Sequence, residues 1–260
     1  MCAPSGGLVG REDRLAGWEN RLAAWEGRLG GWEGRLGGRE GRLGVRVADV
    51  LLLAFDTATP VITVAVHDGT TVVGEASGEG AMAHGELLAP AIRDAMTQAG
   101  AAMADLTDVA VGVGPGPFTG LRVGVVTALT LASTLRLTPH GVCSLDIVAA
   151  DVQVEGEFLV ATDARRKEVY WARYGADHVR LDGPHVLKPA DLAAQHPELP
   201  VYGRGAQLYD SVLRAAGEGS DPRAAALAGL VVAGRAAELP LEPLYLRRPD
   251  AVPQTVSKRA

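Results

Sequence analysis

A glycine-rich segment between an apolar strand and a nearly uncharged helix is the feature that most constrains the fold of this chain. The apolar run 108–113 is typical of a buried strand, and Gly114–Gly124 (GPGPFTGLRVG) follows it. The helix expected over 121–135 has one charged residue, Arg122, and is otherwise apolar or small-residue. A helix of that composition is covered on more than one side. We expect a sheet against one side, and a second helix, a second subunit or both against the other.

The elements around this segment alternate as they do in an α/β fold. The expected strands of this half lie at 50–55, 61–67, 71–77, 108–113 and 139–142. The two-residue turn Asp68-Gly69 favours a hairpin between the second and third of them. A helical stripe of apolar residues covers 86–99. The order of three strands, helix, strand, helix and strand predicts a mixed sheet covered by helices.

The second half of the chain has a weaker pattern. Strands are expected at 157–162, 168–174 and 199–202, and helices at 189–195, 206–216 and 223–237. These elements indicate another α/β lobe. We therefore expect an N-terminal lobe over 50–150, and a C-terminal lobe with an extended tail over 151–260.

Residues 1–49 differ in composition from the rest. From Arg14 a seven-residue repeat places leucine and tryptophan three residues apart, which is the spacing of a coiled coil. Glycines recur in the same stretch, and each costs roughly 1 kcal/mol of helix propensity relative to alanine. The alternatives are a disordered tail or mis-assigned start, a marginal helix, and a functional coiled coil. We favour the first, with the folded part beginning near residue 50.

Composition excludes several classes of protein. The chain has 260 residues, a net charge of −6 and two cysteines, so a disulfide framework and a strongly basic nucleic-acid clamp are not expected, although a local basic patch is compatible with this charge. No apolar run is expected to reach the ~18–20 residues of a membrane span. No apolar segment of the ~7–15 residues found in a signal peptide lies near the N-terminus. We expect a cytoplasmic protein without a membrane anchor.

The glycine segment is also a candidate phosphate or nucleotide site. Backbone N–H groups and the helix dipole bind anions where a glycine loop opens a helix, but the spacing matches neither a Walker A loop nor G-x-G-x-x-G. An aspartate at the end of the first strand can hold Mg²⁺. A ligand-free turn and an Asx turn explain the same residues. The candidates are Asp56, Thr57, Gly114, Gly116, Thr119 and Gly120.

The sequence gives little support for a metal site, an acid–base pair or a catalytic nucleophile elsewhere in the chain. The six histidines have no paired metal-ligand spacing, and His84 with Glu86 is more typical of a helix N-terminus than of an acid–base pair. Cys143 is expected to be buried at a strand end rather than reactive. No nucleophile motif such as G-x-S-x-G is present in the sequence. We predict no catalytic residue, no metal site and no cofactor of the chain's own.

Six segments in order resemble the TsaB (YeaZ) family. They are FDTAT at 55–59, HGELLAP at 84–90, GPGPFTGLRVG at 114–124, VCSLD at 142–146, DARRKEVY at 163–170 and PLYLRRPDA at 243–251. The resemblance implies an ASKHA (actin/Hsp70/sugar-kinase-like) fold of two lobes. It also implies a non-catalytic part in the synthesis of N6-threonylcarbamoyladenosine at position 37 of tRNA.

The same resemblance implies the partners. The related catalytic subunit TsaD would pair through the helices 86–99 and 121–135, the ATPase TsaE would join, and tRNA would be met only indirectly, through the complex. An uncovered apolar face would also allow a homodimer when the chain is alone. The expected interface residues are Leu88, Ile92, Met96, Val125, Ala128, Leu129 and Ala132.

Two positions depart from the related patterns. The catalytic paralogue has an H-x-x-x-H metal pair where this chain has Ser144 and Val148, neither of which is a good metal ligand. Pro117 stands where the family usually has serine, which removes a hydroxyl and an N–H from the loop. The favoured interpretation is a scaffold without catalysis. The alternatives are an ATP-dependent phosphotransferase using Asp56 and the 114–120 loop, and a metallopeptidase.

Overall fold

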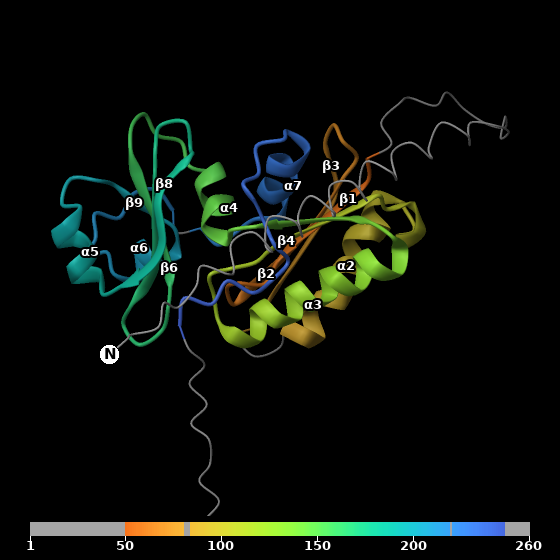
Figure 1. Cartoon of the computed structure of the whole chain (residues 1–260), viewed down its shortest axis with the longest axis horizontal. Coiled ribbons are helices and arrows are strands. Elements are labelled where there is room, and N and C mark those ends of the chain that lie inside the picture. The colour runs from red at the N-terminus through yellow and green to blue at the C-terminus, as the bar shows by residue number, and fades with distance from the viewer. Residues whose placement is uncertain (1–49, 81–83, 219, 248–260) are drawn as a thin grey trace, which may run out of the picture. The chain divides into compact units, whose positions relative to one another are not determined.

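The computed structural model describes residues 50–80, 84–218 and 220–247, which all belong to one compact unit over 48–260. The interpretation of residues 1–49 falls outside these described residues. The described part contains two β-sheets with helices packed around them (Figure 1).

Most elements begin and end close to where the sequence places them. The strands are β1 (Leu52–Asp56), β2 (Val61–His67), β3 (Val72–Glu79), β4 (Asp108–Gly112), β5 (Thr138–Val142), β6 (Phe158–Asp163), β7 (Val169–Tyr174), β8 (Arg180–Leu187), β9 (Val201–Tyr202) and β10 (Glu238–Leu239). The helices are α2 (His84–Ala99), the short 3₁₀ turn η1 (Met103–Asp105), α3 (Phe118–Leu135), α4 (Ser144–Ala150), α5 (Pro189–Gln195), α6 (Arg204–Leu208) and α7 (Ala224–Val232).

The first sheet is mixed and is covered on both faces. Its strand order is β10-β5-β4-β1-β2-β3, with β1 antiparallel to β2 and parallel to β4. Leu53 and Phe55 of β1 pack with residues of α2 and α3, whereas Leu52 and Ala54 pack with Leu227 of α7. Figure 1 shows α2 and α3 on one side of this sheet and α7 on the other. This double cover explains why all five residues of β1 are buried.

The second sheet has the order β8-β7-β6-β9 and its own core. Phe158 of β6 stacks on Tyr174 of β7 with ring centroids 5.4 Å apart, and this side of the sheet packs on α4. On the other side Leu192 of α5 and Ala206 of α6 pack against Trp171. Helix α4 therefore lies between the cores of the two sheets, because Ile147 belongs to the first sheet's core and Val148 to the second's.

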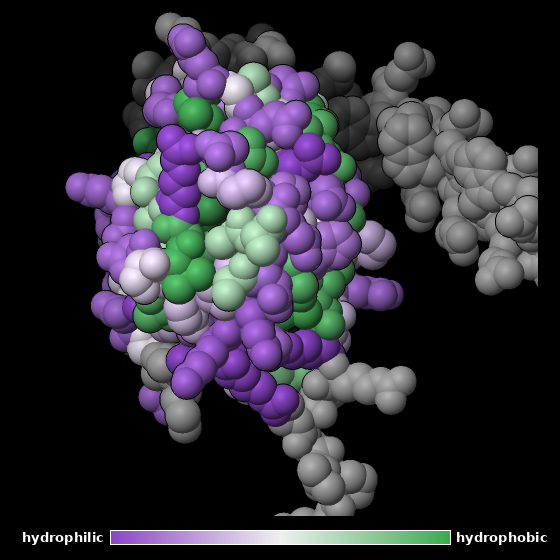
Figure 2. Space-filling view, turned by 90° about the vertical axis from the view of Figure 1, so that its left-hand side faces the viewer, coloured by the Kyte–Doolittle hydropathy of each residue, from purple (hydrophilic) through white to green (hydrophobic). Residues whose placement is uncertain are grey.

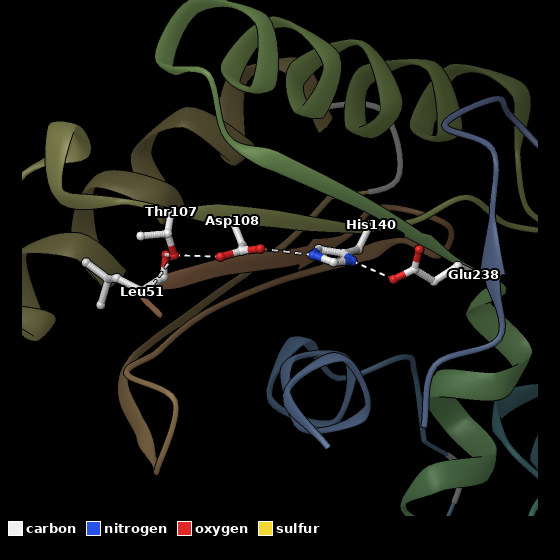
Figure 3. Close-up of polar contacts among 5 residues, drawn as sticks. All are labelled: Leu51, Thr107, Asp108, His140 and Glu238. Atoms are coloured by element: carbon white, nitrogen blue, oxygen red, sulfur yellow. Dashed lines mark hydrogen bonds and ion pairs between the residues drawn. The ribbon is translucent and has the colours of Figure 1, made fainter. Parts of the chain in front are cut away.

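The chain returns to the first sheet after the second is complete. Helix α7 and strand β10 both pack on the first sheet, although the sequence analysis assigned their residues to the C-terminal lobe over 151–260. Strand β10 pairs with β5 and is also tied by His140, whose Nδ1 lies 2.6 Å from Oε1 of Glu238 (Figure 3). The other ring nitrogen of His140 lies 3.1 Å from Oδ1 of Asp108 in β4. One imidazole therefore links three neighbouring strands.

Several elements differ from the sequence expectation. Strands β8 and β10 and helix α4 were not expected, and two expected helices are shorter, since α6 ends at Leu208 and α7 at Val232. Helix α7 ends early because Gly234 adopts a φ of 63°, and the N–H groups of the next two residues bond to the carbonyl of Leu230. A glycine in this conformation commonly ends a helix. The sequence analysis did not predict this end, because the residues on both sides of Gly234 are rich in alanine and favour a longer helix.

Candidate functional site

Asp56 at the end of β1 is completely buried, and both of its carboxylate oxygens have donors. Oδ1 accepts the N–H of Ala58 at 2.7 Å, and Oδ2 accepts the hydroxyl of Ser144 at 2.6 Å. A Cβ at Gly112 would lie 1.7 Å from Oδ2, so the carboxylate fills its space. Burial raises the pKa of Asp56 to about 6, although these two hydrogen bonds act in the opposite direction.

The glycines of the loop face the protein's own backbone. A Cβ at Gly116 would lie 2.4 Å from the carbonyl oxygen of Ala58, and a Cβ at Gly120 would lie 2.3 Å from that of Thr57. The hydroxyl of Thr57 donates to the carbonyl of Gly120 at 2.8 Å. These glycines therefore let the start of α3 pack tightly against the turn after β1.

The six candidate phosphate residues are thus brought together, but they pack on one another. Asp56 and Thr57 are fully buried, and Thr119 is the exposed member of the set. Gly114, at φ 105°, accepts the N–H of Ser144 and donates its own N–H to the Ser144 hydroxyl. Magnesium-bound phosphates do not fit these residues, because the carboxylate and the glycine faces are already occupied by the chain itself.

A metal fits the neighbouring residues no better. Ser144 is buried and its hydroxyl is engaged with Asp56 and Gly114, while Val148 contributes an aliphatic side chain to the core. Among the described residues, no group of three histidine, cysteine or carboxylate side chains could hold a metal ion. Burial raises the pKa of the Cys143 thiol to about 12, so it is not a thiolate nucleophile.

Helix α3 is the second candidate site, and here the expected interface needs correction. Five of the seven expected residues are buried in the chain's own core: Leu88, Ile92, Met96, Val125 and Ala128. They face the first sheet or the other helix, because the apolar stripe of each helix turns inward. Leu129 is 46% exposed and Ala132 is half-buried, so only these two of the seven are accessible.

The accessible surface of α3 is a different stripe of the helix. Its outer face consists of Arg122, Val126, Leu129 and Ser133, which are all exposed; Val126 is 58% exposed. Arg122, the only charge on the helix, lies 3.9 Å from the centroid of the Phe118 ring and donates to the Tyr245 hydroxyl at 3.1 Å. Arg122 is therefore the single charge on this face, and Val126 and Leu129 form its apolar part.

The length of α3 also changes one expectation. The helix has 18 residues and a mean hydropathy of 1.4, so by length and composition alone it could cross a membrane. The expectation that no apolar run is this long was therefore wrong. Leu121, Val125 and Ala128 nevertheless lie against the rest of the described fold, which is the packing of a helix on a sheet.

Two small clefts lie where the loops of the two sheets meet, and sequence reasoning did not find them. One has a volume of about 190 Å³ and is lined by Pro117, Phe118, Arg165, Arg166, Tyr245 and Arg247, among others. The other has about 220 Å³, shares Pro117 and Arg165 with the first, and is also lined by Arg204 and Asp221. The sequence feature that could have indicated these clefts is the arginine pair in the DARRKEVY motif, because it places two cations at a turn between strands.

The comparisons with known proteins agree with this architecture. Residues 78–223 match the family model described as TsaD: tRNA N6-adenosine threonylcarbamoyltransferase. An uncharacterized protein of Mycobacterium tuberculosis (strain H37Rv) is 45% identical over 79% of this chain and 95% of that protein. The tRNA threonylcarbamoyladenosine biosynthesis protein TsaB of Escherichia coli (strain K12) is 37% identical over 53% of this chain and 62% of that protein.

A solved structure extends the likeness to the whole fold. YeaZ from Pseudomonas aeruginosa is 28% identical, with a TM-score of 0.61, over 76% of this chain and 100% of that one. The expected α/β fold with mixed sheets covered by helices is confirmed, and it is the fold of this YeaZ structure. Motif order, family model and fold agree, and the chain belongs to the TsaB/YeaZ family.

Proposed function

We propose that this chain acts in the cytoplasm as a non-catalytic subunit in the biosynthesis of N6-threonylcarbamoyladenosine at position 37 of tRNA. In this proposal it binds the catalytic subunit TsaD through the outer face of α3, and the ATPase TsaE joins the complex. Support comes from the family to which the chain belongs and from the names of its relatives.

The observation that carries the proposal is the exposed apolar stripe on α3. Val126 and Leu129 are 58% and 46% exposed on a helix with a single charge. Apolar side chains grouped in this way are typical of protein–protein contacts. A related subunit of the same fold would offer an equivalent helix, and two such helices can shelter each other's apolar faces.

The absence of catalysis is proposed from the chemistry of the buried groups. A general acid–base or metal-binding carboxylate has to reach its substrate, whereas Asp56 is 0% exposed and hydrogen-bonded through both oxygens. Ser144 is engaged in the same network. The site therefore supports a structural role better than phosphoryl or threonylcarbamoyl transfer.

Reconstitution tests the proposal. We expect the isolated chain to transfer no threonylcarbamoyl group to tRNA from labelled threonylcarbamoyl-adenylate, and full transfer to need TsaD and TsaE as well. Transfer by the isolated chain would contradict the non-catalytic role. Calorimetry with Mg-ATP tests the phosphotransferase alternative, and micromolar binding that is lost in Asp56→Ala would favour it.

The interface is tested with one pair of exposed variants. Leu129→Arg places a charge on the outer face of α3, and we expect it to abolish co-purification with TsaD. Val212→Arg is the matched control, because Val212 is 45% exposed and lies in the other lobe. Equal co-purification of both variants would contradict the assignment of this face.

A further inference from the structure

The turn between β6 and β7 places three cations side by side. Arg165, Arg166 and Lys167, here called the basic turn, are exposed, and their φ angles are 60°, 53° and 61°. The turn is closed by hydrogen bonds from the Ala164 N–H to the Glu168 carbonyl and from the Glu168 N–H to the Arg165 carbonyl. The backbone of three successive residues therefore adopts the left-handed conformation, which is unusual for residues other than glycine, at the tip of a hairpin.

The charge around the basic turn is opposite in sign to that of the chain. The residues of the turn and of the two adjoining clefts carry five cations: Arg165, Arg166, Lys167, Arg204 and Arg247. Three carboxylates accompany them and each contacts an arginine: Asp163, Glu168 and Asp221. The formal charges of these eight described residues sum to +2, in a chain whose net charge is −6. This surface therefore attracts anions more than the acidic average of the chain does.

Aromatic rings lie next to these cations. Phe118 and Tyr245 line the same cleft as Arg165 and stack on each other with centroids 5.0 Å apart. Their side chains remain accessible, with exposed fractions of 36% and 38%. Basic side chains that follow a backbone, together with exposed rings on which bases stack, are the combination that binds unpaired nucleotides.

The size and position of the clefts favour a polymer over a free nucleotide. At about 190 and 220 Å³ both are smaller than the ~300 Å³ at which small-molecule pockets begin. Asp56, which a magnesium nucleotide would need, is enclosed. The cations of the basic turn lie on the outside of the hairpin, where a backbone can pass across them. Figure 2 shows the end of the molecule formed by the second sheet, and hydrophilic residues cover most of its lower part, toward which this hairpin points in Figure 1.

We propose that the basic turn and the Phe118–Tyr245 pair form a contact surface for single-stranded RNA, namely an unpaired segment of the tRNA on which the complex acts. Arg165 and Lys167 contact phosphates, and the exposed ring of Tyr245 receives a base, because Tyr245 and Arg122 already contact the Phe118 ring. The inference rests on the proposed function for the identity of the RNA. It revises the expectation that this chain meets tRNA only through its partners.

The test uses the complex of the full chain with TsaD and an in-vitro-transcribed tRNA that reads ANN codons. The double variant Arg165→Ser/Lys167→Ser is compared with Arg214→Ser/Arg223→Ser, which removes two cations that are 63% and 55% exposed elsewhere. We expect about tenfold weaker tRNA binding for the first variant and little change for the second. The slope of log K against log salt should fall by about 1.4, the value for two lost single-strand phosphate contacts.

A conservative exchange separates charge from folding. Arg165→Lys/Lys167→Arg keeps both charges, so its affinity and salt slope should match those of the unaltered complex. Photo-cross-linking with thiouridine-containing tRNA should map to the peptides that contain residues 164–170 or Tyr245.

Two results would overturn the inference. One is an unchanged affinity and salt slope in the serine double variant. The other is failure of that variant to bind TsaD, because the basic turn would then contact protein. Failure of the unaltered chain to bind TsaD would instead contradict the proposed function. In that case, tRNA affinity of the isolated chain, measured over the same range of salt concentrations, would test the RNA surface.

Discussion

The hydroxyl of Ser144 donates a hydrogen bond of 2.6 Å to Oδ2 of Asp56, although 88 positions separate the two residues in the sequence. Ser144 also accepts the N–H of Gly114 at 3.1 Å. The end of β1, the loop after β4 and the start of α4 thus meet at one buried carboxylate. A negative charge on this carboxylate is shielded from bulk solvent, and this burial raises the pKa of Asp56 to about 6.

Asp56→Asn should change how stability depends on pH. The pKa of Asp56 rises from 3.8 in the unfolded chain to about 6 in the fold, so the unfolded chain releases its proton first as pH increases. Stability is therefore lost between these two values, by about 3 kcal/mol at most. We expect the free energy of unfolding of the unaltered protein to fall by this amount relative to Asp56→Asn between pH 4 and pH 7. Urea denaturation measures both free energies. A difference between the two proteins that stays constant from pH 4 to pH 7 would mean that the pKa of Asp56 is not raised in the fold.

Gly120→Ala should destabilise the fold by about 1–3 kcal/mol, because the added Cβ would lie 2.3 Å from the carbonyl oxygen of Thr57. Gly229→Ala in α7 is the control, since a Cβ there meets nothing within 4 Å. That control should gain about 0.5–1 kcal/mol from the lower entropy of the unfolded chain. Thermal denaturation of both variants measures the difference. Equal stabilities would mean that Gly120 does not pack tightly on the Thr57 carbonyl.

Ala128→Arg and Leu129→Arg should behave very differently, although the residues are neighbours. Ala128 is 0% exposed, so an arginine there has to bury an unpaired charge, and we expect a loss of about 4 kcal/mol or more. Leu129 is 46% exposed, and its replacement should change stability by less than about 0.5 kcal/mol. Circular dichroism on heating separates the two. A folded, stable Ala128→Arg would indicate that the helix faces are reversed.

His140→Gln should weaken the fold mainly at low pH. The hydrogen bond to Asp108 raises the pKa of His140 above 6.5, burial opposes this, and Glu238 raises it further. A raised pKa in the fold means that the contribution of His140 is fully present below pH 6.5 and is lost as pH rises through the higher value. The melting temperatures of the two proteins should differ most at pH 6 and least at pH 9. A difference that grows with pH would reverse the sign of this linkage.

The sequence predicted much of the first lobe because its signals are local. Alternating β-branched residues marked β2, whose bounds were predicted to the residue, and the Asp68-Gly69 turn marked the hairpin that follows. Strand β8 was missed because Gly183 and Pro184 interrupt it, and both residues are usually depleted in strands. Strand β10 has two residues and exists through its pairing with β5, which no local pattern reveals.

The candidate site shows the same division between local and long-range information. The sequence indicated that Asp56 and the glycine loop would meet, and they do. It did not indicate that Ser144 would bond Asp56 or that Ala58 would fill the space beside Gly116, because both contacts depend on how three separate loops converge. The composition of α3 indicated that one of its faces is not covered by the sheet. Composition did not indicate which residues form that face, because this depends on the side of the helix that packs on the sheet.

The late return of the chain to the first sheet has a consequence for synthesis on the ribosome. Leu52, Ala54 and Ala65 are covered by α7, and the edge of β5 is paired by β10, yet both elements lie beyond residue 223. Until those residues emerge, a nascent chain exposes the apolar surface of its earliest sheet that α7 covers, together with an open strand edge. Chaperone capture during translation should therefore be strongest for ribosome-bound chains that end just before α7, and it should drop once β10 has cleared the exit tunnel.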